Sequence, residues 1–233
     1  MNQPTRQYRN RILASLPKPE LERIVRHLTF IPLPQHKGLL DERLSCGYFL
    51  ESGVASIVVT LCNGDSVEVG VAGIEALIGL SLLLGAQAPL GHTFMQIGGS
   101  GFRITALHLR EAFEHCQGLR QHVLRYMQAF LTQIAQTAAC NRMHTIDERL
   151  ARWLLACRDR VDSDQLRLTH EFLAQMLGAP RTTVTQAAGI LQRSGLIACE
   201  RGAVTIADRA RLEKAACECY RTVRDTYRQL DLL

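Results

Sequence analysis

The distribution of glycine constrains this chain more than any other feature of its sequence. Of its 17 glycines, 13 fall at or before Gly118, and the stretch 119–177 contains neither glycine nor proline. Because both residues interrupt regular elements, the front is predicted to turn often and the stretch after Gly118 to form long helices. The sequence therefore predicts two parts of different architecture.

Short runs rich in valine, isoleucine, phenylalanine and tyrosine lie in the front part and are bounded by turn-forming residues. They occupy residues 48–50, 54–61, 67–71, 94–97 and 102–104. Such runs predict strands, and the Asn63-Gly64 pair between the second and third favours a hairpin. Strands at this spacing are typical of an antiparallel, jelly-roll-like β roll.

Apolar residues then recur at steps of three and four, as they do on one face of an amphipathic helix of about 25 residues. Such a stripe can pack on its own domain or form a seam between two copies of the chain. We favour the seam, because a β roll alone offers little surface to so long a stripe. The predicted seam residues are Leu119, Val123, Tyr126, Met127, Phe130, Ile134 and Ala138.

A capping box at Thr145 and Glu148 predicts the start of a new helix and a hinge before it. Further on, Thr169 can cap a short helix, residues 178–180 make a tight turn, and a second helix covers about 181–193. This spacing is typical of a helix-turn-helix. Two short strands around Arg201 and Gly202 predict a wing behind it.

The second of these helices is predicted to expose its N-terminal face. Arginine can form a bidentate contact with guanine, glutamine pairs with adenine edges, and a threonine methyl can meet a thymine methyl. Arg201 at the wing tip suits a phosphate, although a solvated surface arginine is the alternative. The predicted DNA-contacting residues are Thr169, His170, Arg181, Thr182, Thr183, Thr185, Gln186 and Arg201.

Composition and motifs exclude several function classes. The apolar stretches are about half of the roughly 20 residues that a membrane span needs, so we expect a cytoplasmic protein with no membrane partner. No nucleophile elbow or phosphate loop is found, so we expect no enzyme. The eight cysteines are scattered without a CxxC pair, so we expect reduced thiols and no metal site. Cys217 and Cys219, two apart on a helix, should point in different directions, and a redox or metal role for them is the alternative.

The chain resembles the CRP/FNR superfamily of bacterial transcription regulators over nearly its whole length, most strongly from Ala135 to Ile206. The resemblance rests on QIAQTAACNRMHTIDERLARWLL from Gln133, LTHEFLAQMLG from Leu168 and RTTVT from Arg181. It implies an α+β chain with an N-terminal cyclic-nucleotide-binding-like roll, a long dimerisation helix and a C-terminal winged helix-turn-helix. The implied partners are a second copy of the chain, double-stranded DNA with a two-fold operator, and RNA polymerase. The predicted boundaries are 1–117 for the roll, 118–144 for the dimerisation helix and hinge, 145–211 for the DNA-binding domain and 212–233 for a helical extension.

The chain departs from the family pattern at the residues that bind the effector in cyclic-AMP-responsive members. Cyclic-AMP-responsive members hold the ribose with a Gly-Glu pair and the phosphate with an Arg-Ser pair, whereas this chain has Leu80 after Gly79 and His92-Thr93 at the second place. No lysine or arginine lies between Ser45 and Phe102. We therefore expect a small effector other than cyclic AMP, and neither an iron–sulfur cluster nor haem as cofactor; a cyclic-nucleotide-sensing module is the alternative function. The candidate effector-pocket residues are Gly79, Leu80, His92, Thr93, Ile134 and Ala135.

Overall fold

The computed structural model describes residues 7–161 and 163–233, so residues 1–6 of the predicted roll domain and position 162 lie outside the description. The N-terminal part is an antiparallel sheet in the order β1-β5-β2-β3, with β4 paired to β2. Its strands are β1 (Thr29–Leu33), β2 (Cys46–Thr60), β3 (Ser66–Ala72), β4 (Leu77–Ile78) and β5 (His92–Thr105). The predicted antiparallel β roll is confirmed.

Two strands are longer than the sequence predicts. The runs 48–50 and 54–61 are continuous in β2, and 94–97 and 102–104 are continuous in β5. The pairing between β2 and β5 shifts register near Ser52, so each strand bends without ending. A Cβ at Gly99 would lie 2.1 Å from the carbonyl oxygen of Ser52, so glycine here permits a close crossing of strands. At Gly64, by contrast, φ is +89° and the predicted turn forms.

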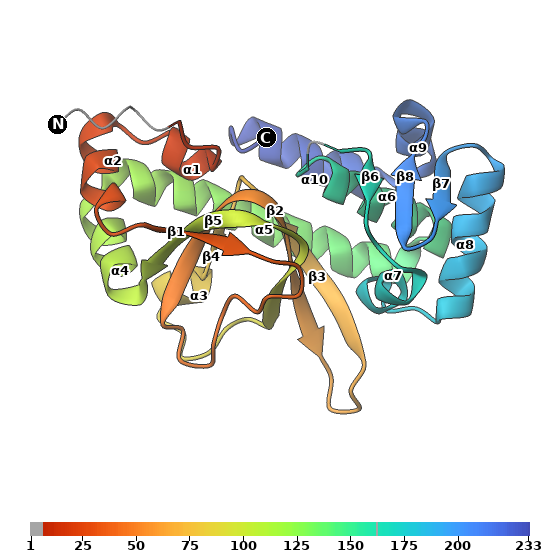
Figure 1. Cartoon of the computed structure of the whole chain (residues 1–233), viewed down its shortest axis with the longest axis horizontal. Coiled ribbons are helices and arrows are strands. Elements are labelled where there is room, and N and C mark those ends of the chain that lie inside the picture. The colour runs from red at the N-terminus through yellow and green to blue at the C-terminus, as the bar shows by residue number, and fades with distance from the viewer. Residues whose placement is uncertain (1–6, 162) are drawn as a thin grey trace.

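Four short helices surround the sheet, and one long helix crosses the molecule. The short helices are α1 (Arg11–Ala14), α2 (Lys18–Val25), α3 (Leu80–Leu83) and α4 (Ala106–His115). Helix α5 (Gln117–Met143) has 27 residues, close to the predicted length. In Figure 1 it passes behind the sheet and reaches the C-terminal part of the chain.

Four of the seven residues that the sequence assigns to the seam are buried in their own roll. Leu119 and Val123 are 0% exposed and Tyr126 is 1% exposed, because all three pack into the core of their own roll. Phe130 is also buried there. These four residues have no surface left for a second copy, so their assignment to a dimer interface is wrong. The sheet buries more of the apolar face of α5 than we expected from the pattern of short strands in the sequence.

A second, narrower apolar stripe remains exposed on α5. Leu124 is 51% exposed and Leu131 is 61% exposed, and Ala138 follows after another seven residues. Met127 and Ile134 are half-buried at the edge of this stripe. We call these five residues the outer stripe of α5. Their spacing is that of a coiled-coil seam.

The C-terminal part is a helical domain with a small sheet. It contains α6 (Ile146–Arg158), α7 (His170–Leu177), α8 (Arg181–Arg193) and α9 (Arg209–Ala215), with strands β6 (Gln165–Leu166), β7 (Ile197–Glu200) and β8 (Ala203–Ile206) in the order β6-β8-β7. The predicted capping box forms, with the Thr145 amide donating to the Glu148 carboxylate at 2.9 Å. The core of this domain includes Val54, Val58 and Val71 of the sheet, so the domain packs directly on the roll.

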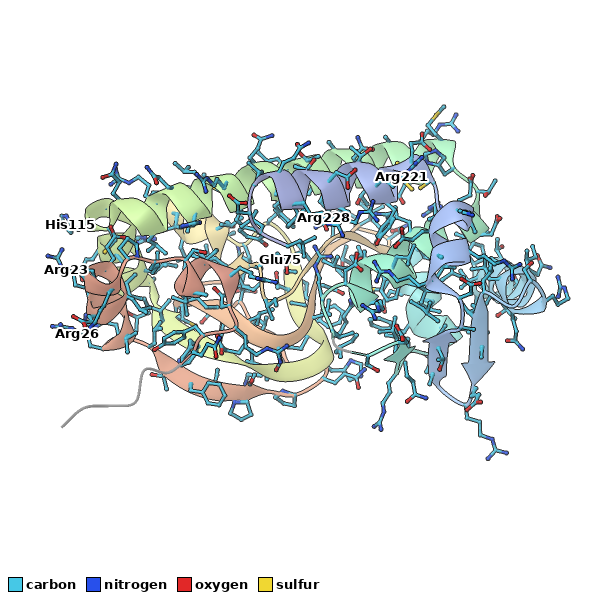
Figure 2. All side chains as sticks on the ribbon, turned by 90° about the horizontal axis from the view of Figure 1, so that it is seen from above. Arg23, Arg26, Glu75, His115, Arg221 and Arg228 are labelled. Atoms are coloured by element: carbon cyan, nitrogen blue, oxygen red, sulfur yellow. The ribbon has the colours of Figure 1, made fainter. Side chains whose placement is uncertain are left out.

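Helix α10 (Glu218–Gln229) ends the chain and packs against α5. Figure 2 shows it running back from the C-terminal domain alongside α5, with Glu75 beneath it in the interior. No helix within the described ranges is both long and apolar enough to cross a membrane.

Candidate DNA-binding surface, effector pocket and domain junction

Helix α8 stands on the surface with its N-terminal face uncovered. Its inward face is small and buried, with Ala187 and Ala188 each 1% exposed against α6 and α7. Small side chains at this crossing let the helices approach closely. The side chains left exposed at the start of α8 are Arg181, Thr182, Thr185 and Gln186, with Thr183 half-buried. These are the residues to which the sequence assigned base contacts.

The turn before α8 is built as the sequence predicts. The Thr169 hydroxyl accepts a hydrogen bond from the Phe172 amide at 3.1 Å and so caps α7. Gly178 ends that helix with φ +57°, a conformation that glycine adopts without strain. The imidazole Nδ1 of His170 lies 3.2 Å from the Thr185 hydroxyl, which ties the start of α7 to the exposed face of α8.

Arg181 is held by an exposed partner. Its guanidinium lies 3.5 Å from the Glu171 carboxylate, and both side chains are mostly solvated, at 68% and 80% exposure. Exposed ion pairs contribute little to stability, so Arg181 can leave Glu171 at small cost. At the wing, Arg201 and Gly202 are exposed between β7 and β8.

An apolar pocket of about 250 Å³ lies between the roll and α5. Its described lining contains no charged side chain, and its side-chain hydroxyls are those of Ser81, Thr93 and Tyr126. The pocket is lined by Leu40, Ile57, Leu77, Ile78, Gly79, Leu80, Ser81, Leu84, Leu90, Thr93, Tyr126, Met127, Phe130, Leu131 and Ile134. It adjoins the outer stripe of α5, because Met127, Leu131 and Ile134 belong to both.

The structure brings together four of the six candidate effector residues. Gly79, Leu80, Thr93 and Ile134 line the pocket. His92 is exposed and stacks on Phe94, with ring centroids 5.4 Å apart, so it does not reach the pocket.

The sixth candidate, Ala135, is exposed on α5 and lies outside the pocket lining. Leu40, Leu84 and Leu90 come from loops whose positions the sequence pattern did not indicate. The apolar character of this region follows from Leu80, which the sequence had singled out.

A buried ion pair joins the roll to the C-terminal domain. The Arg160 Nε atom lies 2.7 Å from a Glu75 carboxylate oxygen, and the two side chains are 3% and 0% exposed. Although burial alone would lower the pKa of Arg160, the adjacent Glu75 carboxylate raises it above its ordinary value. The guanidinium also lies over the Tyr227 ring of α10, 5.4 Å from its centroid. Arg160 therefore contacts both the roll, through Glu75, and α10, through Tyr227. The sequence analysis did not predict this role for Arg160.

A second buried contact crosses the same boundary. The Trp153 indole of α6 donates a hydrogen bond to Glu68 of β3 at 2.7 Å, and the Ser56 hydroxyl donates to the other oxygen at 2.6 Å. Burial raises the pKa of Glu68 to about 7, even though both hydrogen bonds lower it. Protonation of Glu68 is thus linked to the contact between roll and C-terminal domain.

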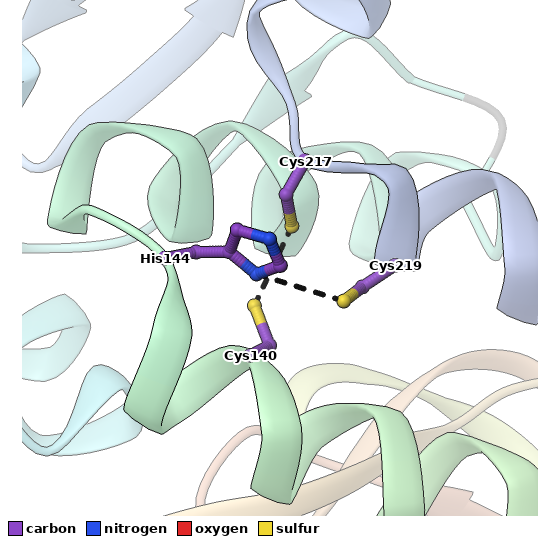
Figure 3. A group of neighbouring side chains, drawn as sticks. All are labelled: Cys140, His144, Cys217 and Cys219. Carbon is purple, nitrogen blue, oxygen red and sulfur yellow. Dashed lines mark hydrogen bonds between the residues drawn. The ribbon is translucent and has the colours of Figure 1, made fainter.

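The C-terminal cysteines do not lie as the sequence predicts. Cys217 is the N-cap of α10 and Cys219 lies in its first turn, so the two residues are not both inside the helix. Their sulfur atoms converge with Cys140 and His144, and the four ligand atoms lie within 4.8 Å of one another (Figure 3). The expectation that Cys217 and Cys219 point in different directions is wrong. No sequence motif indicated this cluster, because Cys140 and Cys217 are 77 residues apart in the chain and His144 and Cys219 are 75 apart.

The fold and the exposed helix are those of a β roll followed by a winged helix-turn-helix domain. Residues 148–215 match the model of the Crp-like helix-turn-helix domain. No curated protein matches the sequence of this chain.

Solved structures share the fold over nearly their whole length. FixK2 from Bradyrhizobium japonicum is 16% identical, with a TM-score of 0.69 over 82% of this chain and 98% of its own. A CRP-family transcriptional regulator from Thermus thermophilus is 22% identical, with a TM-score of 0.66 over 80% and 96%. The c-di-GMP-responsive regulator CLP from Xanthomonas campestris is 16% identical, with a TM-score of 0.68 over 82% and 100%. The match over residues 148–215 confirms the helix-turn-helix part of the resemblance, and about four fifths of the chain shares the fold of solved regulators of this kind.

Proposed function

We propose that this chain binds a two-fold DNA operator as a homodimer and that an apolar ligand in the roll pocket regulates it. The observation that carries the DNA-binding part is the uncovered N-terminal face of α8, where Arg181, Thr185 and Gln186 are exposed together. A recognition helix reads the major groove with its N-terminal residues, and these side chains can pair with base edges. Arg201 at the wing supplies a phosphate contact.

The outer stripe of α5 supports the homodimer. Leu124, Leu131 and Ala138 recur every seven residues and lie away from the roll core. A second copy that packs its own stripe against this one would bury these side chains and present two copies of α8. Two recognition helices should contact half-sites about 34 Å apart, which is one turn of DNA.

The pocket supports a ligand unlike cyclic AMP. A cyclic phosphate keeps a full negative charge, and a buried charge needs a partner. The described pocket lining offers three side-chain hydroxyls and no cation, and the pocket volume of about 250 Å³ is below the roughly 300–1,000 Å³ of sites for drug-sized ligands. A small apolar molecule fits this chemistry. Because Met127, Leu131 and Ile134 line the pocket and belong to the outer stripe of α5, a bound ligand would act on the dimer contact.

Selection of binding sites from random DNA tests the DNA-binding proposal. We expect a palindromic consensus and a gel shift whose stoichiometry is two chains per site. RNA polymerase is the partner proposed for the DNA-bound dimer. Failure to enrich any sequence, with folded protein at low salt, would contradict this function and favour a ligand-sensing module without DNA binding.

Titration calorimetry with cyclic AMP tests the pocket proposal separately. We expect no binding with useful affinity. A low micromolar dissociation constant together with tighter operator binding would overturn the apolar-ligand proposal and leave the DNA-binding proposal intact.

A further inference from the structure

The sulfur and nitrogen atoms of the cysteine cluster converge on one small volume. Cys140 lies near the end of α5, and His144 is the residue that ends it. The Cys140 and Cys217 sulfurs are 3.5 Å apart, and the Cys219 sulfur is 3.7 Å from His144 Nδ1. Figure 3 shows the four side chains pointing toward a common centre from α5 and from the start of α10.

These two separations match two edges of a tetrahedral metal site, and all four ligand atoms lie within 4.8 Å of one another. With zinc–sulfur bonds of about 2.3 Å and zinc–nitrogen bonds of about 2.0–2.1 Å, tetrahedral geometry places two sulfurs about 3.8 Å apart and a sulfur and nitrogen about 3.6 Å apart. Three thiolates and one imidazole form a donor set that zinc prefers. A disulfide would use only two of the sulfurs and would leave the other cysteine and His144 without a role.

The surroundings resemble those of a closed structural site. Cys140, Cys217 and Cys219 are 0%, 5% and 2% exposed and form a cluster of their own. The second ring nitrogen of His144, Nε2, lies 3.2 Å from a Glu218 carboxylate oxygen. Histidines that bind metal usually donate their other N–H to a carboxylate, which fixes the ring and the tautomer. Glu218 therefore orients His144 Nδ1 toward the three sulfurs.

We propose that Cys140, His144, Cys217 and Cys219 bind one zinc ion. Four protein ligands leave no open position, so the ion is structural. It fastens the start of α10 to the joint between α5 and α6, where the long helix meets the DNA-binding domain. The ion thereby ties the C-terminal extension to the segment that sets the position of α8.

Metal analysis of the full chain, purified with a thiol reductant, tests the site. We expect about one zinc ion per chain. After removal of zinc by a chelator, titration with Co²⁺ should give the visible absorption of tetrahedral cobalt with thiolate-to-metal charge transfer, saturating at about one equivalent. This readout uses the unchanged protein and does not depend on how any variant folds.

Variants assign the ligands. Cys217→Ser and Cys219→Ser should each abolish the stoichiometric zinc and the cobalt charge-transfer spectrum. Cys62→Ser is the matched control, because Cys62 is exposed and outside the cluster, and it should retain both. Glu218→Gln keeps all four ligands and should weaken zinc about 10–100-fold in competition with a chelator.

Three results would overturn the proposal. The first is a reduced chain without metal that binds neither Zn²⁺ nor Co²⁺ at micromolar concentration. The second is full zinc content in both cysteine variants. The third is bound iron with acid-labile sulfide, which would replace the single ion with a cluster.

Discussion

Replacement of Arg160 by methionine should destabilise the protein more than most single substitutions. Methionine keeps an unbranched apolar side chain but removes the guanidinium that lies 2.7 Å from Glu75. The Glu75 carboxylate then stays 0% exposed, with the Gly73 amide, at 3.1 Å, as its remaining hydrogen-bond donor in the described structure. Removal of one partner of a buried pair costs about 3–5 kcal/mol, because the other charge is left uncompensated. We expect the free energy of unfolding to fall by that amount.

A double-mutant cycle separates the charge from the packing. Glu75→Gln keeps an acceptor for the Gly73 amide and removes the buried charge, so Arg160→Met with Glu75→Gln should recover about 2 kcal/mol relative to the sum of the single changes. Urea unfolding can be followed by the fluorescence of Trp153, the one tryptophan of the chain, at a fixed protein concentration. A loss below about 1 kcal/mol for Arg160→Met, or additive effects in the double variant, would refute the reasoning.

Three further predictions concern the DNA-binding face, the dimer and the roll contact. Arg181→Ala should lower specific DNA affinity by about 1–3 kcal/mol and relax the choice of one base pair, whereas Arg201→Ala should weaken all sequences alike; equal losses on every sequence would make Arg181 a phosphate contact. Leu131→Glu should give monomers by light scattering at micromolar concentration, while the exposed control Gln121→Glu should stay dimeric. An unmodified protein that is monomeric would contradict a dimer contact through the outer stripe of α5. Because burial raises the pKa of Glu68 from 4.5 to about 7, its protonated form contributes about 3 kcal/mol that is fully present below pH 4.5 and is lost as the pH rises through about 7. Glu68→Gln should flatten the pH dependence of urea stability over this window, and an unchanged slope would show that another group titrates.

Local patterns predicted helices α5, α6, α7 and α8, whereas the four short helices of the roll were not predicted. The capping box at Thr145, the cap at Thr169 and the turn at Gly178 depend on atoms within a few residues of one another. The predicted bounds of α8 therefore agree with the structure, and the side chains that we propose for DNA contact were correctly predicted to be exposed. Glycine was a weaker guide in the roll, because Gly99 permits a close strand crossing and does not mark a turn.

The long amphipathic α5, the tight turn before α8 and the lack of lysine or arginine between Ser45 and Phe102 all follow from the sequence alone. Periodicity, capping and composition are read from neighbouring residues, so no knowledge of the fold is needed. Which surface covers each face of α5 depends on how the folded chain packs: Tyr126 is buried in its own roll, and Leu131 stays 61% exposed. The packing of α10 on α5 likewise brought Cys140 and Cys217 together across 77 residues. Contacts between residues so far apart depend on how whole elements pack, and no local pattern in the sequence records that.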